Sequence, residues 1–266
     1  MFEVKDTELP NLIELKNISQ SYDGGKSYII QDLNLLIEDK PGQGQFVILL
    51  GMSGSGKSTL LRYIAGLQDP TKGEVLIYGK KRTEADHVGM VFQQYSSFPW
   101  MTVLENVGIG LEFKGLEEKE RNQKALEIIE LVGLQGHEHK FAQYPTLSGG
   151  QLQRVAIARS LLANSDILLM DEPFGALDIK TRVQMQDLLL SLWNKFHSTV
   201  LFVTHDIREA VYLGDDIYFM KSAPSKIVEH VKVNLPLERN QDTRRLPRYN
   251  ELVFEVEDTM FKIGSK

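Results

Sequence analysis

A glycine-rich run that ends in lysine and serine is the first segment whose residue types could do chemistry. Its residues fit the pattern G-x-x-x-x-G-K-[ST]: Gly51, Met52, Ser53, Gly54, Ser55, Gly56, Lys57 and Ser58. The glycines let the backbone wrap a phosphate closely, and a helix starting around Thr59 adds the positive end of its dipole. In this pattern Lys57 reaches the β- and γ-phosphates, while the Ser58 hydroxyl ligates Mg²⁺. The alternative is a plain glycine-rich turn, but the strand predicted before the run and the helix after it favour a phosphate loop.

A pair of acids follows a second apolar run. Asp171 and Glu172 come directly after residues 166–170, which we predict to be a buried strand. In an open α/β sheet, ligands bind beyond the carboxyl ends of the strands. Asp171 is therefore placed to hold Mg²⁺, and Glu172 to polarise an attacking water as a general base or orienting group. The alternative is an acidic pair that caps a helix, but the phosphate loop favours the catalytic interpretation.

A second segment suited to anion binding lies further along the chain, at Leu147-Ser148-Gly149-Gly150-Gln151. It precedes a predicted helix, so the Ser148 hydroxyl and the N–H groups of both glycines can face a phosphate. One nucleotide has one triphosphate, yet the chain has two elements that can grip it. The economical arrangement is a head-to-tail dimer, in which this segment of one chain closes over the nucleotide held by the loop of the other.

Together these motifs closely resemble those of the ABC ATPases, over nearly the whole chain. Gln93 resembles the glutamine that senses Mg²⁺ and faces the membrane partner. Asp178 resembles the key residue of the family's dimer-contact loop, and Tyr22 resembles the aromatic residue that stacks on adenine. His205 resembles the histidine that contacts the γ-phosphate and helps to hold Glu172 and the water. The resemblance implies an active ATPase, because no member of the catalytic set is missing.

Apolar patterns predict the elements that must position these residues. Alternating or continuous apolar runs predict strands, and apolar residues at helical spacing predict helices. The predicted strands lie at 12–22, 33–37, 46–50, 166–170 and 199–203, and the predicted helices at 117–132, 151–163 and 180–197. In 117–132 the apolar residues at helical spacing are Leu126, Ile129 and Val132. The alternation of strands and helices implies a parallel sheet flanked by helices.

The resemblance implies an α/β fold with a P-loop NTPase core of the RecA-like type, an N-terminal antiparallel β subdomain and an inserted α-helical subdomain. We expect a nucleotide-binding domain at 1–230, with the helical subdomain at about 96–158, where helices interrupt the alternation. A charged tail at 231–266 should carry a last helix after Pro247. The turn at 38–45 is longer than is usual in the family, so we expect a surface insertion there.

Residues 98–107 and 235–239 resemble the importer subfamily for nitrate, sulfonate, taurine and related small solutes. In that subfamily the first region receives a short cytoplasmic helix of the membrane subunit. The apolar side chains of Phe98, Trp100 and Met101 suit a groove for such a helix. The alternative is that these three residues belong to the core of the helical subdomain.

Composition narrows the class of protein. The 266 residues are 42% hydrophobic and 25% charged, which is ordinary for a globular chain. The absence of cysteine excludes disulfides and thiolate metal sites, and a net charge of −6 argues against sequence-independent binding of nucleic acid. We see no signal-peptide pattern at the N-terminus and no apolar run of the about 18 residues that a membrane span needs. His137 and His139 lie two apart in a charged stretch, which favours a solvated loop over a metal site.

The resulting hypothesis is an ATPase that binds ATP with Mg²⁺, dimerises with a second copy of itself and powers a membrane importer for a small solute such as nitrate, sulfonate or taurine. Its expected partners are transmembrane permease subunits and, indirectly, a solute-binding protein, with no nucleic acid. Its expected location is the cytoplasmic face of the cell membrane, as a peripheral protein. The alternative is a solitary ABC-type ATPase acting on DNA or in cofactor assembly. A pure binding module is a third option, which Glu172 and His205 argue against.

Overall fold

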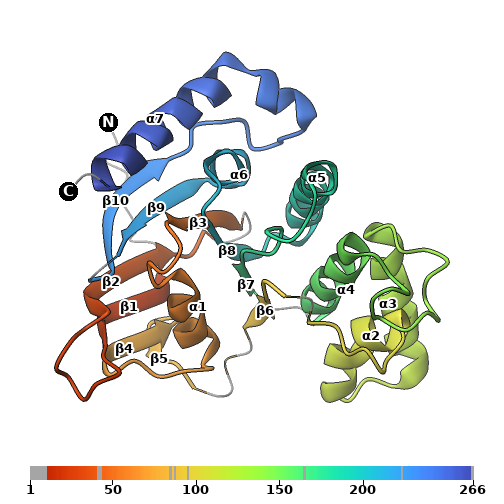
Figure 1. Cartoon of the computed structure of the whole chain (residues 1–266). Coiled ribbons are helices and arrows are strands. Elements are labelled where there is room, and N and C mark those ends of the chain that lie inside the picture. Colours follow the sequence, from red (N-terminus) through yellow and green to blue (C-terminus); the bar gives the residue numbers. More distant parts are fainter. Residues whose placement is uncertain are drawn as a thin grey trace, which may run out of the picture.

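Two β-sheets form the framework of the chain. The computed structural model describes residues 11–40, 44–83, 86, 88–94, 96–163, 166–222 and 224–264. A four-stranded antiparallel sheet has the strand order β2-β1-β4-β5 and a six-stranded sheet has the order β10-β9-β3-β8-β7-β6 (Figure 1). The antiparallel strands are β1 (Asn11–Gln20), β2 (Ile30–Glu38), β4 (Lys72–Ile77) and β5 (Lys80–Lys81). The expected surface insertion at 38–45 includes residues 41–43, which lie outside the described ones.

The larger sheet is parallel except at one edge. Its strands are β3 (Gln45–Gly51), β6 (Gly89–Val91), β7 (Ile167–Asp171), β8 (Thr199–Thr204), β9 (Asp216–Lys221) and β10 (Lys226–Lys232). β3 pairs in parallel with both β8 and β9, and only the edge strand β10 runs antiparallel to its neighbour among the described strands. Parallel pairing brings the carboxyl ends of β3, β7 and β8 to one edge of the sheet, where ligands bind in such folds. The predicted α/β fold class is confirmed.

Alternate residues of β3 enter two different hydrophobic cores, as expected for a strand that is covered on both faces. Phe46, Ile48 and Leu50 belong to the core formed with the helices on one face. Val47 and Leu49 belong to the core shared with the antiparallel sheet and with α1 (Lys57–Ala65). Both cores therefore fix the position of β3, and with it the start of the loop that follows.

Among the described residues, three helices lie between β6 and β7 in the sequence, and they gather beside the β6 edge of the larger sheet (Figure 1). They are α2 (Val103–Phe113), α3 (Glu118–Leu131) and α4 (Gly149–Leu162), which continues past 158. The prediction that Leu126 shares the apolar face of α3 is wrong, since its side chain is exposed. The buried residues of α3 are Ala125, Ile128 and Ile129, and Leu126 lies about 100° around the helix from Ala125.

The chain ends in a segment that packs against the parallel sheet and its helices. α5 (Ile179–Phe196) precedes β8, and α6 (Ile207–Leu213) follows it. After β10 come a short 3-10 helix, η1 (Gln241–Arg245), and α7 (Pro247–Gly264), which confirms the predicted helix after Pro247. α7 buries Tyr249, Leu252, Val253 and Val256 in the same core as α6, so the final helix is an integral layer of the fold.

Candidate nucleotide site

The glycine-rich loop joins the end of β3 to α1, as the sequence predicts. Gly54 and Gly56 have φ angles of 80° and 88°, a left-handed conformation that glycine adopts without strain. Gly51 lies so close to the neighbouring strand β9 that a Cβ there would be 2.5 Å from the carbonyl oxygen of Met220. Within the described part of the chain no side chain caps α1, so its first N–H groups remain available to an anion. Met52, Ser53 and Gly54 are exposed at the rim of this loop.

Lys57 is buried at the base of the loop. Its Nζ donates hydrogen bonds to the carbonyl oxygens of Gly51 at 2.8 Å and Met52 at 3.0 Å. Its Nζ also lies 3.8 Å from Oε1 of Glu172. Burial lowers the pKa of the Lys57 ammonium, and the charges of Glu172 and Asp171 oppose that shift. The lysine thus stands between the phosphate loop and the acidic pair.

Ser58 and Asp171 supply two adjacent oxygen atoms. The Ser58 hydroxyl donates to Oδ1 of Asp171 at 2.7 Å, joining the first turn of α1 to the end of β7. Burial raises the pKa of the Asp171 carboxyl, and the hydrogen bond from Ser58 opposes this. Hydroxyl and carboxylate oxygens are ligands that Mg²⁺ prefers. Two of the three residues predicted to contact Mg²⁺, Ser58 and Asp171, therefore meet although they come from distant segments.

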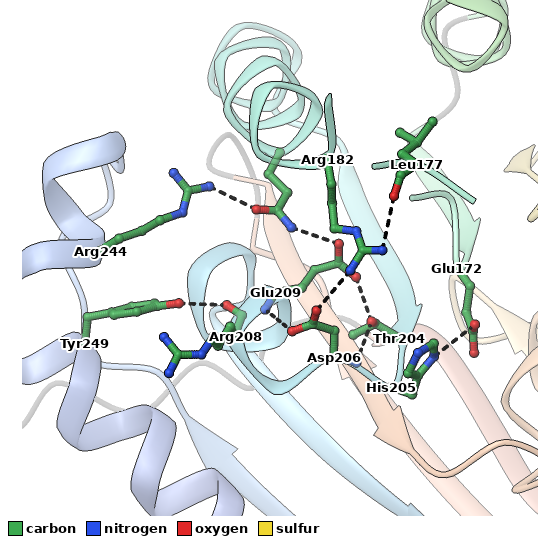
Figure 2. A network of polar contacts seen from close by, with 11 residues as sticks. Glu172, Leu177, Arg182, Thr204, His205, Asp206, Arg208, Glu209, Arg244 and Tyr249 are labelled. Atoms are coloured by element: carbon green, nitrogen blue, oxygen red, sulfur yellow. Dashed lines mark hydrogen bonds and ion pairs between the residues drawn. The ribbon is translucent and has the colours of Figure 1, made fainter. Parts of the chain in front are cut away.

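Glu172 has a strained backbone that directs its carboxylate into the site. Its φ is 42°, which is rare for a residue with a side chain, and its N–H donates to the carbonyl oxygen of Val203 at 3.1 Å. Its Oε2 lies 3.0 Å from Nδ1 of His205, a contact that Figure 2 shows. A Cβ at Gly175 would lie 3.8 Å from Gln93 Nε2 and 3.9 Å from Glu172 Oε2, so Gln93 borders the same site.

The second anion-binding segment lies at the N-terminus of α4. Ser148 is the N-cap residue: its Oγ accepts from the N–H of Gln151 at 3.3 Å, and its own N–H donates to Oε1 of Gln151 at 2.8 Å. The Gln151 amide also lies 2.9 Å from Nε2 of His137, which is half-buried rather than solvated as expected. A Cβ at Gly150 would lie 2.7 Å from Cγ2 of Thr181, so this end of α4 packs directly on α5.

The remaining predicted residues lie on separate segments of the chain. Asp178 is the N-cap of α5 and accepts a hydrogen bond from the N–H of Thr181, so it adjoins Gly150 and its neighbours. Gly149 is the first residue of α4, and Thr59 lies in the first turn of α1. Tyr22 is 69% exposed, with its hydroxyl 3.2 Å from the Gln68 amide, so most of its ring surface is open.

Sequence reasoning missed a buried polar cluster behind His205. Glu209 is only 5% exposed and accepts hydrogen bonds from Thr204 and Gln186 (Figure 2). From sequence, Asp206 and Glu209 fit the spacing of a helix capping box, whose acid is usually solvent-exposed. Asp206 does cap α6, but the side chain of Glu209 points into the interior instead. No local pattern marks that choice, because Gln186 comes from another helix.

Comparisons with known proteins agree on one family. A sequence profile described as ABC transporter matches residues 31–175. The chain is 43% identical over 228 residues to a nitrate import ATP-binding protein of Synechocystis sp., covering 84% of this chain and 83% of that protein. It is 42% identical over 258 residues to an aliphatic sulfonates import ATP-binding protein of Bacillus subtilis, covering 95% and 98%. It is also similar to a dimeric post-hydrolysis structure of an ATP-binding cassette bound to ADP and Pi, with a TM-score of 0.71 and 37% identity, covering 84% of this chain and 99% of that one.

Proposed function

The chain belongs to the ABC transporter family, and we propose that it is the ATP-hydrolysing subunit of an importer whose membrane-spanning part is made by other chains. Two of its relatives are named as import ATP-binding proteins for nitrate and for aliphatic sulfonates. The single observation that carries the proposal is the convergence of Lys57, Ser58, Asp171, Glu172 and His205 at the carboxyl edge of the parallel sheet. Among the described residues, no helix is both long and apolar enough to cross a membrane.

In the proposed reaction, each side chain acts on the terminal phosphate or on the attacking water. Lys57 exchanges its two carbonyl partners for phosphate oxygens and places a positive charge beside the γ-phosphate. Glu172 orients the water and accepts its proton, and the 3.0 Å contact with His205 fixes the direction of the carboxylate. The backbone N–H groups of the loop and of α1 stabilise the charge that develops in the transition state.

The oxygen pair formed by Ser58 and Asp171 fits a magnesium ion. The pair is already held at 2.7 Å, and both atoms are hard oxygen donors, with the amide of Gln93 bordering the same site. Ser58 and Asp171 would hold Mg²⁺, which would supply positive charge to offset that of the phosphates. Burial is the main cause of the raised pKa of Asp171, and the positive charges of Arg62 and Lys57 oppose that shift.

The active form proposed here is a head-to-tail dimer of two copies. Within one chain, the bonds described for Ser148 and Gln151 join residues of α4 and the loop before it, rather than the phosphate loop. Each nucleotide would therefore lie between Lys57 of one copy and Ser148 of the other. Asp178 caps the helix turn whose Thr181 lies against Gly150, which supports a dimer-contact loop at the same face. The dimeric form of the similar cassette structure supports this arrangement.

An aromatic surface on the helical part is the proposed contact for the membrane subunits. Trp100 is 71% exposed, and its ring centre lies 5.4 Å from that of Phe98. The guanidinium of Arg159 lies over the Phe98 ring. Phe98 and Met101 are half-buried, so of the three apolar residues predicted to face a partner, Trp100 offers the most surface. Dimer closure would move this surface and pull the permease subunits with it. The solute, one of the nitrate or sulfonate kind, would be selected by those chains and by a solute-binding protein.

The deciding experiment compares Glu172→Gln with Lys57→Ala. Glu172→Gln should bind MgATP, lose turnover by about two to four orders of magnitude, and accumulate as an ATP-bound dimer, because binding and closure no longer lead to hydrolysis. Lys57→Ala should lose nucleotide binding itself. ATPase assays, equilibrium dialysis with ATP and sedimentation velocity measure the three properties. Turnover near the wild-type rate in Glu172→Gln would contradict the mechanism, and failure of native permease subunits to copurify with the chain would contradict the transport role.

A further inference from the structure

We infer that the C-terminal segment at 233–264 holds the turn that carries His205 and so sets the rate of hydrolysis. Arg244 of η1 acts on this turn through two buried side chains, Gln186 and Glu209 (Figure 2). The inference rests on the proposed function, because it concerns how His205 and Glu172 are kept in place. It assigns the end of the chain a part in catalysis without any contact with nucleotide.

In the first two hydrogen bonds, Arg244–Gln186 and Gln186–Glu209, the donor and the acceptor are fixed. Nη2 of Arg244 lies 2.9 Å from Oε1 of Gln186, and a guanidinium can only donate. The amide oxygen of Gln186 therefore faces Arg244, and its Nε2 must donate to Oε1 of Glu209, 3.0 Å away. Gln186 and Glu209 are both buried, so neither can exchange this hydrogen bond for one to bulk water. The orientation of Gln186 thus depends on the arginine of the tail.

Through Thr204, Glu209 fixes the backbone on both sides of His205. The Thr204 hydroxyl donates its one hydrogen to Oε2 of Glu209 at 2.6 Å, which leaves its lone pairs to accept the N–H of Asp206 at 3.0 Å. Thr204 and Asp206 flank His205 in the chain. Burial raises the pKa of the Glu209 carboxyl, and the two hydrogen bonds that it accepts oppose that shift. The charged groups that face it are Asp206 and Arg182.

One small cavity is bordered both by the buried polar cluster around Glu209 and by the His205–Glu172 pair. The residues that line a cavity of about 20 Å³ include Glu172 and His205 as well as Thr204 and Glu209. That volume is enough for about one water molecule. A change in the position of Thr204 or Glu209 therefore alters the surroundings of the His205–Glu172 contact directly.

The tail is anchored where it meets α5 and α6. Arg244 pairs with Asp187 at 2.9 Å and lies 3.4 Å over the ring of Tyr212. The Tyr249 hydroxyl donates to the carbonyl oxygen of Arg208 on α6 at 3.1 Å, as Figure 2 also shows. These contacts hold Arg244 against Gln186, so a shift of the tail would remove the donor and free the amide to turn.

The test uses the full chain with two variants and a matched control. Arg244→Ala and Gln186→Leu should each lower kcat by about threefold to thirtyfold, the usual range of coupling through a network, with KM for ATP changed by less than about twofold. Arg244→Lys should recover part of the rate. The control is Arg245→Ala, which removes the neighbouring arginine of η1, 85% exposed and paired with Asp242. Rates are normalised to nucleotide sites titrated on the same sample, so loss of folded protein does not count as loss of rate.

Two results would support the inference, and the others would overturn it. The first supporting result is a lowered kcat with an almost unchanged KM. The second is a double variant, Arg244→Ala with Gln186→Leu, that is no slower than the slower single variant, because both substitutions break the same series of hydrogen bonds. The inference fails if Arg244→Ala matches Arg245→Ala in kcat, or if the two single effects simply add. An inactive wild-type chain would overturn the proposed function and the inference together, whereas an active wild type with an unaffected Arg244→Ala overturns the inference alone.

Discussion

Ser148 has two separable roles in the proposed dimer, so its substitution gives a quantitative test. Its hydroxyl caps α4 within its own chain, and in the dimer it would contact the nucleotide of the other copy. Ser148→Ala should cost about 1 kcal/mol of folding stability through loss of the cap. A hydrogen bond to a charged phosphate contributes about 1.5–3 kcal/mol, and a two-fold dimer contains two such sites. The dimer should therefore weaken by about 3–6 kcal/mol, or about two to four orders of magnitude in its dissociation constant.

The assay is ATP-dependent dimerisation in the Glu172→Gln background, followed by sedimentation velocity, with urea unfolding on the same samples. Ser148→Asp is the matched variant, because aspartate caps a helix as well as serine does. It should keep the wild-type stability, yet its carboxylate would repel the phosphate and abolish the dimer. If Ser148→Ala dimerises with unchanged affinity, or if Ser148→Asp still forms the ATP-bound dimer, the shared nucleotide site is wrong.

Two further substitutions test the energetics of the fold and site. Asp171→Asn keeps an oxygen that accepts the hydrogen bond of Ser58. It should stabilise the nucleotide-free protein by about 1 kcal/mol at pH 7, because it removes the cost of burying a charged carboxylate at a functional site. The folded pKa of Asp171 exceeds its ordinary value of 3.8, so wild-type stability falls as pH rises through that window, and the difference should vanish below pH 3.8 in thermal melts. Arg239→Ala should destabilise by about 3–5 kcal/mol in urea unfolding, because it removes the cation that pairs with Asp215 and the donor to three carbonyl oxygens at the end of α6. The exposed Arg248→Ala should cost under about 1 kcal/mol, and equal losses for both arginines would contradict this account.

Features that depend on a few consecutive residues were predictable from sequence. The phosphate loop needs glycine at positive φ, and Gly54 and Gly56 have it. The continuous apolar run of β3 predicted a strand covered on both faces, which the two cores confirm. The face of α3 was predicted wrongly at Leu126, because one apolar residue beside an apolar stripe fits the same local period. The half-buried place of His137 was also missed, since its partner Gln151 comes from the following helix.

The sequence by itself therefore determined the chemical parts: the loop that can wrap a phosphate, the acids at a strand end and the capped helix start that can hold an anion. Only the tertiary structure decided which parts meet. Ser58 and Asp171 are 113 residues apart, Glu172 and His205 are 33 apart, and Arg244 and Gln186 are 58 apart. Loop geometry and caps follow from local φ preferences and hydrogen bonds, which a short segment carries alone. The order of strands in the parallel sheet follows from burying both of its faces at once, and that depends on the whole chain.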